Sequence, residues 1–213
     1  MERSNGEKRR KLLGEILLEK YIITQEMLDS ALALQRKDQG KYLGQIFLEM
    51  GIDQEQLNQV LDYFQHRKKI GDILLEDNAI VASQLEEALR KQKEEKNPRK
   101  PLGRILMELG YINYEQYLNA LAKHFVMQVV SLKNFMPSKE QQKIIGELYA
   151  LKNKVVVLED GIEKLKLALS EPNLAMMGEI RRFARLEKRI EFYLTRAPEI
   201  EPCLDQLYPN RPH

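Results

Sequence analysis

The sequence has little of several features that would mark out a compartment. It holds one cysteine, Cys203, among 213 residues, so no disulfide can form within the chain. No apolar run approaches the roughly 18 residues that a membrane-spanning helix needs. The start Met-Glu-Arg-Ser also lacks the apolar stretch of a secretory signal. Together these absences predict a cytoplasmic protein without a membrane span.

An excess of one charge is lacking as well. The chain has 34 Lys and Arg residues against 32 Asp and Glu residues, a net charge of +2, which gives no broad field to attract a nucleic acid. Basic clusters lie at 8–11, 66–69 and 96–100, and we expect them to be solvated charges at helix ends and in linkers. Aromatic residues make up 7% of the chain and are not interleaved with these clusters. Binding to a nucleic acid polymer is therefore not expected.

Motifs for catalysis and metal binding do not occur. The sequence has no G-x-x-x-x-G-K-[ST] loop to cradle ATP phosphates, no H-E-x-x-H, no C-x-x-C and no nucleophile elbow. Its histidines are scattered, at His66, His124 and His213. We predict that the chain is not an enzyme, has no catalytic residues and holds neither a metal nor a cofactor.

One short stretch of sequence, called the phrase below, recurs four times in the chain. LLGEILLEK, YLGQIFLEM, KIGDILLED and PLGRILMEL are four versions of it, and a glutamate stands five residues after the glycine of each. The aligned glycines are Gly14, Gly44, Gly71 and Gly103. Their separations of 30, 27 and 32 residues are typical of a repeated two-helix unit.

A second helical pattern follows each phrase after a short break. Leucines four residues apart form one helix face, as in the pairs Leu28 and Leu32, Leu57 and Leu61, and Leu85 and Leu89. Side-chain oxygens suited to an N-cap precede three of the patterns, at Thr24, Asp53 and Asn113. In the third copy, Ser83 with a glutamate three residues later predicts a capping box. We expect four tandem helical hairpins whose leucines and isoleucines are buried.

After Phe125 the pattern changes from helical to alternating. The residues predict a β-rich run over 126–132, strands at 155–160, 163–172 and 188–196, and helices at 138–154, 173–187 and 198–208. Ser138 is a suitable helix cap, and Gly161 suits the turn of an antiparallel hairpin. The predicted fold class is α plus α/β. Its domains are 1–65 with repeats 1 and 2, 66–125 with repeats 3 and 4, and 126–213 as a small α/β domain.

Three stretches carry a resemblance to a known family. LGEILLEKYIITQEMLDSALALQ, KIGDILLEDNAIVASQLEEALRKQ and VVVLEDGIEKLKLALSEPNLAMMGEIRRF resemble the N-terminal, MshE-like region of the ATPases of type II secretion and type IV pilus assembly. The resemblance covers nearly the whole chain but does not include the motor domain. In several members of that family this region binds cyclic di-GMP through a tandem motif of RLG, a later glycine, two leucines and a glutamine.

The resemblance implies a set of candidate ligand residues. A cyclic dinucleotide presents two guanine edges and two phosphates, so its receptor needs cationic donors and glycines where backbone comes close. The family's arginine position holds Leu12, Tyr42, Lys69 and Pro101 here, so no copy keeps the arginine. The residues that match the rest of the motif or supply nearby charge are Lys69, Gly71, Gln92, Lys100, Gly103, Gly110, Gly14 and Gln35.

Two functions follow from the resemblance and stay open at this point. The first is an interaction module that docks on a cytoplasmic component of a secretion or pilus machine, which would place it peripheral to the inner membrane through that partner. The basic residues Arg181, Arg182 and Arg185 are candidates for the docking surface, or else form the exposed face of a helix. The alternative is a cyclic di-GMP receptor in which the ligand clamps repeats together and alters domain orientation.

Overall fold

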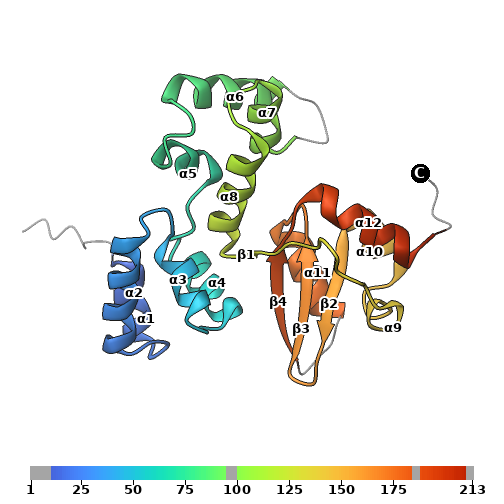
Figure 1. Ribbon diagram of the computed structural model, residues 1–213. Helices are drawn as coiled ribbons and strands as arrows, with labels where there is room; N and C mark the ends of the chain where they lie inside the picture. Colours follow the sequence, from blue (N-terminus) through green and yellow to red (C-terminus); the bar gives the residue numbers. More distant parts are fainter. Residues whose placement is uncertain (1–10, 95–99, 184–187, 210–213) are drawn as a thin grey trace, which may run out of the picture. The chain divides into compact units, whose positions relative to one another are not determined.

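The structure is a computed structural model that describes residues 11–94, 100–183 and 188–209 (Figure 1). Its contacts divide the chain into two compact units, one up to Arg67 and one from Lys68 onward. The first unit is helical, whereas the second combines helices with a four-stranded sheet. Mixed helical and sheet structure is what the sequence predicts. None of the helices in the described ranges is long and apolar enough to cross a bilayer.

Helices in the first unit alternate between short and long. Their bounds are α1 Leu13–Glu19, α2 Gln25–Lys37, α3 Leu43–Glu49 and α4 Gln54–Tyr63. The apolar triplets of the repeated phrase lie in the short helices and fill the core of this unit. Ile16, Leu17 and Phe47 are at most 1% exposed, and Leu57 of α4 is fully buried.

The same alternation opens the second unit, with α5 Ile70–Glu76, α6 Ala82–Glu94, α7 Leu102–Glu108 and α8 Tyr114–Phe125. Here α6 packs on α7 and α5 packs on α8. Lys123 of α8, whose side chain is 8% exposed, binds Asp77 at the end of α5 at 2.6 Å. One predicted core residue is wrong, because Leu89 stays 38% exposed on α6.

Side-chain caps begin the long helices where the sequence predicts them, with one exception. Thr24, Asp53 and Asn113 accept hydrogen bonds from the amides three residues later. The predicted cap at Ser83 is wrong, because α6 already begins at Ala82. The Gln84 side chain there accepts a hydrogen bond from the Val81 amide at 3.0 Å, so the glutamine satisfies the amide that precedes the helix.

Each short helix ends in the same Schellman turn. The residue after the C-cap has a positive φ, and it and its successor donate to carbonyls in the last turn over 2.9 to 3.0 Å in all four cases. The residues with positive φ are Tyr21, Gly51, Asn78 and Gly110. This turn reverses the chain between the short and the long helix, which is why glycine or asparagine occupies three of the four positions.

The sheet of the second unit has the order β1-β4-β3-β2. Its strands are β1 Gln128–Val129, β2 Val155–Asp160, β3 Lys164–Leu169 and β4 Arg189–Leu194. β2 and β3 form an antiparallel hairpin at Gly161, as predicted, while β4 runs parallel to both β3 and β1. Leu165, Leu167, Leu169 and Leu194 are fully buried in this sheet.

Four helices accompany the sheet: α9 Lys139–Gln142, α10 Glu147–Asn153, α11 Leu174–Phe183 and α12 Ala197–Leu207. The single helix predicted over 138–154 is wrong, because Gly146 adopts a φ of +75° and separates α9 from α10. Ser138 caps α9 as predicted. α9, α10 and α12 all pack against β2, and Cys203 is buried within α12.

The Schellman turn of the first repeat contains a residue that the conformation penalises. Tyr21 has a φ of +54° and is 95% exposed, so its side chain contributes little packing. Relief of about 1–2 kcal/mol of left-handed strain exceeds the roughly 0.5–1 kcal/mol entropic cost of glycine. We therefore expect Tyr21→Gly to raise the free energy of unfolding by about 0.5–1 kcal/mol, measured by urea denaturation.

Tyr21→Ala is the matched control, since it removes the same exposed ring but keeps a β-carbon at positive φ. It should not stabilise the protein. The conformational argument would be wrong if the glycine and alanine variants unfolded at the same urea concentration.

Candidate functional site

The glutamate of the repeated phrase forms an ion pair in every copy. Its partner is a lysine three residues before the phrase glycine, and the lysine side chain spans the whole short helix. The pairs are Lys11–Glu19 at 2.6 Å, Lys41–Glu49 at 2.8 Å, Lys68–Glu76 at 2.5 Å and Lys100–Glu108 at 2.9 Å. All eight side chains are at least 41% exposed, so each pair contributes at most about 1 kcal/mol to stability.

The phrase glycine is a packing residue. A β-carbon on Gly14 would lie 2.6 Å from a methyl group of Leu28, and one on Gly71 would lie 2.9 Å from a methyl group of Leu85. On Gly103 it would overlap the ring of Tyr117. In each case the neighbour belongs to the long helix of the same copy. These glycines let the two helices of a hairpin approach closely.

The glutamine that closes the motif bonds the backbone at the start of the next copy. Gln35 donates to the Lys41 carbonyl at 3.2 Å, and Gln92 donates to the Lys100 carbonyl at 2.8 Å. His124 stands at the same place in the fourth copy, and its Nδ1 donates to the Lys68 carbonyl at 2.7 Å. Copies three and four are thus tied reciprocally, α6 to the start of α7 and α8 to the start of α5.

The predicted ligand residues therefore lie in different surroundings. It joins Gln92 to Lys100, and it buries Gly71 and Gly103 between helices. Lys69 is the exposed N-cap of α5, and Gly110 is an exposed turn residue with a φ of +72°. Gly14 and Gln35 belong to the first unit. Of the basic clusters, 8–10 and 96–99 lie outside the described residues.

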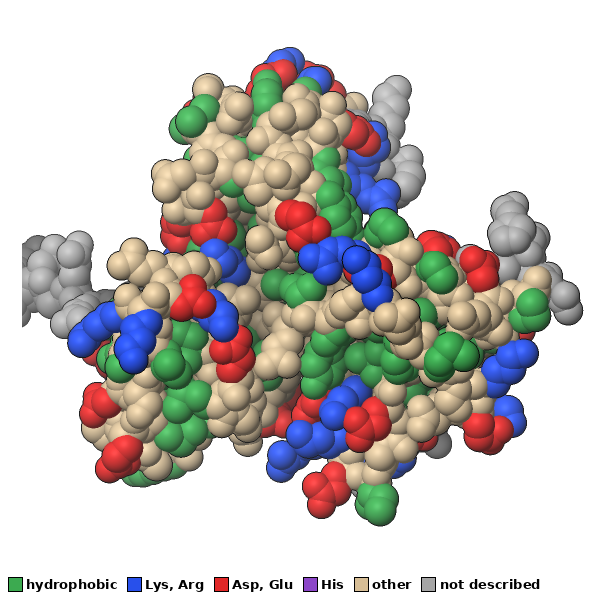
Figure 2. All heavy atoms as spheres, in the orientation of Figure 1, with side chains coloured by type: hydrophobic (Ala, Val, Ile, Leu, Met, Phe, Trp, Pro, Cys, Tyr) green, Lys and Arg blue, Asp and Glu red, His purple; other side chains and the backbone are tan. Residues whose placement is uncertain are grey.

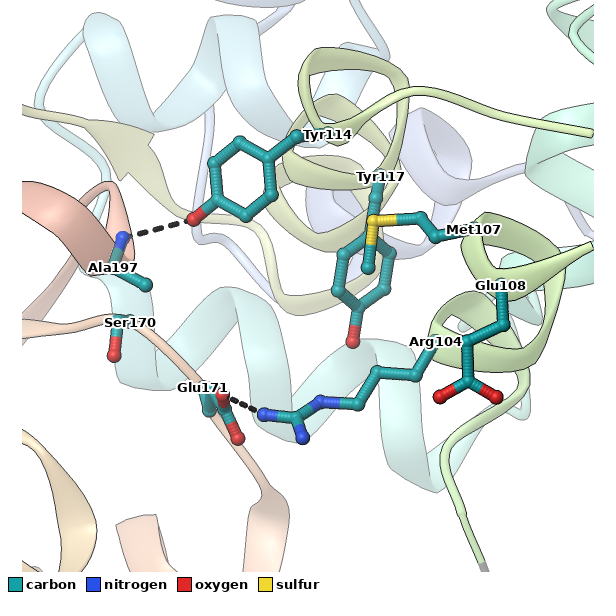
Figure 3. A pocket seen from close by; sticks show the side chains of 8 residues that line it. All are labelled: Arg104, Met107, Glu108, Tyr114, Tyr117, Ser170, Glu171 and Ala197. Atoms are coloured by element: carbon teal, nitrogen blue, oxygen red, sulfur yellow. Dashed lines mark hydrogen bonds and ion pairs between the residues drawn. The ribbon is translucent and has the colours of Figure 1, made fainter. Parts of the chain in front are cut away.

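A pocket opens where α7 and α8 meet the ends of β3 and β4 (Figure 3). Its volume is about 320 Å³. The residues that line it are Arg104, Met107, Glu108, Tyr114, Tyr117, Ser170, Glu171 and Ala197. A pocket that combines two aromatic rings, a cation and carboxylates suits a small planar polar molecule.

Three polar contacts join α7 and α8 to the segments that follow β3 and β4. Arg104 forms an ion pair with Glu171 across the pocket, as Figure 3 shows. The Ala197 amide donates to the Tyr114 hydroxyl at 2.9 Å. Beside them Arg196 donates to both carboxylate oxygens of Glu115, at 2.9 and 3.0 Å, and this hydrogen bonding lowers the pKa of Glu115.

Two of the residues that line the pocket carry hydroxyl groups and are largely buried. Tyr117 is 8% exposed and Ser170 is 4% exposed. Burial raises the pKa of Tyr117, so its phenol remains protonated at neutral pH. Figure 3 shows its hydroxyl directed toward Arg104.

Sequence reasoning missed this pocket, although a signal for it exists. Copy four departs from the other copies at the positions that line it. After the phrase glycine it has Arg104 where they have Glu15, Gln45 and Asp72. Tyr117 likewise takes the place of a leucine in each of the other copies. These departures mark the face of the fourth hairpin that meets the sheet.

The arginines predicted to bind a partner differ in their surroundings. The Arg181 guanidinium lies over the ring of Phe192, 5.1 Å from its centroid, and the residue is half-buried. Arg182 is exposed on α11, whereas Arg185 lies outside the described residues. On the face in Figure 2, blue and red side chains lie among one another rather than gathering by sign. Within 11–94, 100–183 and 188–209, no three His, Cys, Asp or Glu side chains are arranged to hold a metal ion.

Comparison with known proteins finds a family likeness in the second part of the chain. Residues 125–213 match the family described as MshEN domain. The matched stretch comprises the end of α8, the sheet and its helices. The comparison with curated proteins found no match.

One solved structure extends the likeness into the helical region. A structure of MshE with cyclic di-GMP is 26% identical and has a TM-score of 0.60; the alignment covers 67% of this chain and all of that chain. That share is larger than residues 125–213 amount to, so some of the helices are included. The N-terminal domain of XpsE is 15% identical with a TM-score of 0.44, over 67% of this chain and 94% of that one.

The ion pair between Glu115 and Arg196 should make the stability of the fold depend on pH. Because the pKa of Glu115 is lowered in the folded protein, its pairing with Arg196 stabilises the fold above pH 4.5 and is lost as the pH falls through the folded-state pKa. We expect Glu115→Gln to unfold at lower urea concentration than the parent protein at pH 7. The difference should shrink steadily below pH 4.5.

Glu86→Gln is a suitable control, since Glu86 is exposed on α6 of the same unit. Its unfolding midpoint should follow that of the parent protein at each pH. A deficit in Glu115→Gln that stayed constant from pH 7 to pH 3 would contradict the electrostatic account.

Proposed function

We propose that the chain is a non-catalytic regulatory and interaction module of a type II secretion or type IV pilus-like machine. The observation that carries this proposal is the MshEN domain over residues 125–213. In the proposal the module docks on a cytoplasmic component of the machine, so that it lies in the cytoplasm, peripheral to the inner membrane. The absence of a phosphate-binding loop from the sequence is consistent with a role that does not involve ATP hydrolysis.

The helices in front of this domain are, in the proposal, four copies of one hairpin. The support is that each short helix spans seven residues, carries a Lys–Glu ion pair and ends in a Schellman turn. Copies one and two would occupy 1–65 and copies three and four 66–125, followed by the α/β domain at 126–213. A hairpin of this size cannot bury its apolar face alone, which explains why the copies associate in pairs.

The docking surface that we propose includes α11 with Arg181, Arg182 and Arg185. Of these, Arg182 is the exposed cation in the described part of the helix, while Arg181 packs on Phe192 and stiffens the helix against the sheet. Exposed arginine is well suited to bind an acidic protein surface, because its guanidinium forms paired hydrogen bonds with carboxylates.

Affinity purification from the native host tests the docking proposal. The tagged protein should recover a component of a secretion or pilus machine, and Arg182→Glu should reduce that recovery at least about tenfold, a loss of roughly 1.4 kcal/mol. Arg36→Glu on α2 makes the same change at another exposed arginine and should recover the component normally. Recovery of no such component by the parent protein would contradict the proposal.

A second candidate function is reception of cyclic di-GMP. It is favoured by the likeness to MshE with that ligand and by the pocket that Arg104, Tyr114 and Tyr117 line. A ligand that bound α7, α8 and the sheet together would change the equilibrium orientation of the helices on the sheet. The proposed contacts are the motif residues and the nearby cations. In the second unit these are Arg104 of the pocket, Lys69, Gly71, Gln92, Lys100, Gly103 and Gly110. In the first unit they are Gly14 and Gln35.

Titration calorimetry with cyclic di-GMP decides this candidate. A receptor should bind with a dissociation constant tighter than about 10 µM, and Lys69→Ala and Arg104→Ala should each weaken binding about tenfold. Lys91→Ala changes another exposed lysine of the same unit and should leave the affinity unchanged. No heat of binding at ligand concentrations well above that constant would rule out the receptor function.

A further inference from the structure

The first turn of α7 differs from those of α1 and α3 in a way that frees one side chain. In α1 the Glu15 carboxylate accepts a hydrogen bond from the amide of the N-cap Leu12 at 2.7 Å, and Gln45 accepts the corresponding bond in α3 at 3.1 Å. The N-cap of α7 is Pro101, which has no amide hydrogen to donate. The side chain at the equivalent position of α7, Arg104, is therefore not needed as a cap.

The Arg104 side chain instead reaches across the pocket to Glu171 (Figure 3). This carboxylate comes from the segment after β3, where Ser170 and Pro172 on either side of it are buried. A residue before a proline is also confined to extended backbone. The backbone of Glu171 is thereby anchored, while its side chain is 50% exposed and that of Arg104 is 44% exposed. Both side chains can change rotamer without moving the helix or the strand.

The carboxylate occupies donors that an anionic ligand would use. Among the residues that line the pocket, Arg104 is the cation. A guanidinium binds phosphate oxygens and carboxylate oxygens through the same paired N–H groups. The Tyr117 hydroxyl is directed toward Arg104 in Figure 3, and burial raises the pKa of this phenol, so it stays a donor for either anion. Glu171 and a ligand phosphate would therefore compete for one set of donors.

The ion pair between Arg104 and Glu171 is weak enough to be exchanged. Water screens a pair whose side chains are both about half exposed, so the pair contributes little to stability. Replacing the carboxylate by a phosphate keeps the guanidinium paired, so no charge is left unsatisfied. The other carboxylate of the lining, Glu108, is itself paired with Lys100 at 2.9 Å, which reduces its repulsion of an anion.

We infer that Glu171 is an internal competitor, which occupies the Arg104 guanidinium until a phosphate group of a bound nucleotide takes its place. The inference rests on the receptor function proposed above and adds a means of regulation at the same pocket. A nucleotide that also stacks on the ring of Tyr114 or Tyr117 can displace the carboxylate. An anion that contacts Arg104 alone gains little, because it exchanges one ion pair for another.

Titration calorimetry with cyclic di-GMP tests the inference on the parent protein, Glu171→Gln, Arg104→Ala and the double variant. Glu171→Gln should tighten binding about two- to fivefold, as expected when an exposed ion pair no longer has to be broken. In the Arg104→Ala background the same substitution should change the affinity little, because no guanidinium remains to be released. Equal gains in the two backgrounds would reflect charge repulsion alone and would overturn the inference.

The same titrations separate the inference from the receptor function. If the parent protein binds cyclic di-GMP and Glu171→Gln binds it no more tightly, the inference is wrong and the receptor function stands. If neither protein binds at ligand concentrations well above about 10 µM, the receptor function fails and the inference fails with it.

Glu86→Gln is the matched control, because it removes an equal charge from an exposed position on α6. It should bind with the affinity of the parent protein. Glu171→Gln should also unfold close to the urea concentration of the parent protein, because the substituted side chain is half exposed, so a gain in affinity would not arise from altered stability. A gain in Glu86→Gln equal to that in Glu171→Gln would mean that net charge sets the affinity, and would overturn the inference as well.

Discussion

The helical part of this protein depends on the close approach of a short helix to the long helix that follows it. At Gly14, Gly71 and Gly103 there is no room for a β-carbon, because Leu28, Leu85 and Tyr117 occupy that space. The approach brings the apolar triplet of the short helix into the core. The Schellman turn and the Lys–Glu pair act on the same seven residues, the turn by reversing the chain and the pair by spanning the helix. The same close approach is therefore found at three of the four phrase glycines.

The fourth phrase and the helix after it differ from the other three in their side chains. They carry Arg104, Tyr114 and Tyr117, which line a pocket beside the part of the chain that matches the MshEN family. The contacts between these helices and the segments that follow β3 and β4 include ion pairs and a hydrogen bond. A junction of this kind can respond to a ligand or a partner, because its polar groups can exchange partners at little cost in buried apolar area.

Much of the fold follows from the sequence, and particular residues show why. The helical period of the leucines and the N-caps Thr24, Asp53 and Asn113 locate the starts of three long helices. An N-cap can be read from the sequence because it bonds an amide within the first turn of its own helix. The strand at 155–160 and the turn at Gly161 are local signals of the same kind. The helix over 138–154 was wrong because one residue, Gly146, adopts a conformation that the helical period does not reveal. The cap at Ser83 was wrong because Gln84 satisfies the preceding amide instead.

The candidate site was harder to predict. The motif glycines and glutamines were recognised from the sequence, but their contacts in the structure are to neighbouring helices. By itself the sequence determined the helix and strand segments, the repeat period and the family resemblance, because these depend on residues close together in the chain. Only the tertiary structure decided that Arg104 meets Glu171 and that Gln142 bonds the backbone of β2, because those partners come from different elements and are brought together by packing.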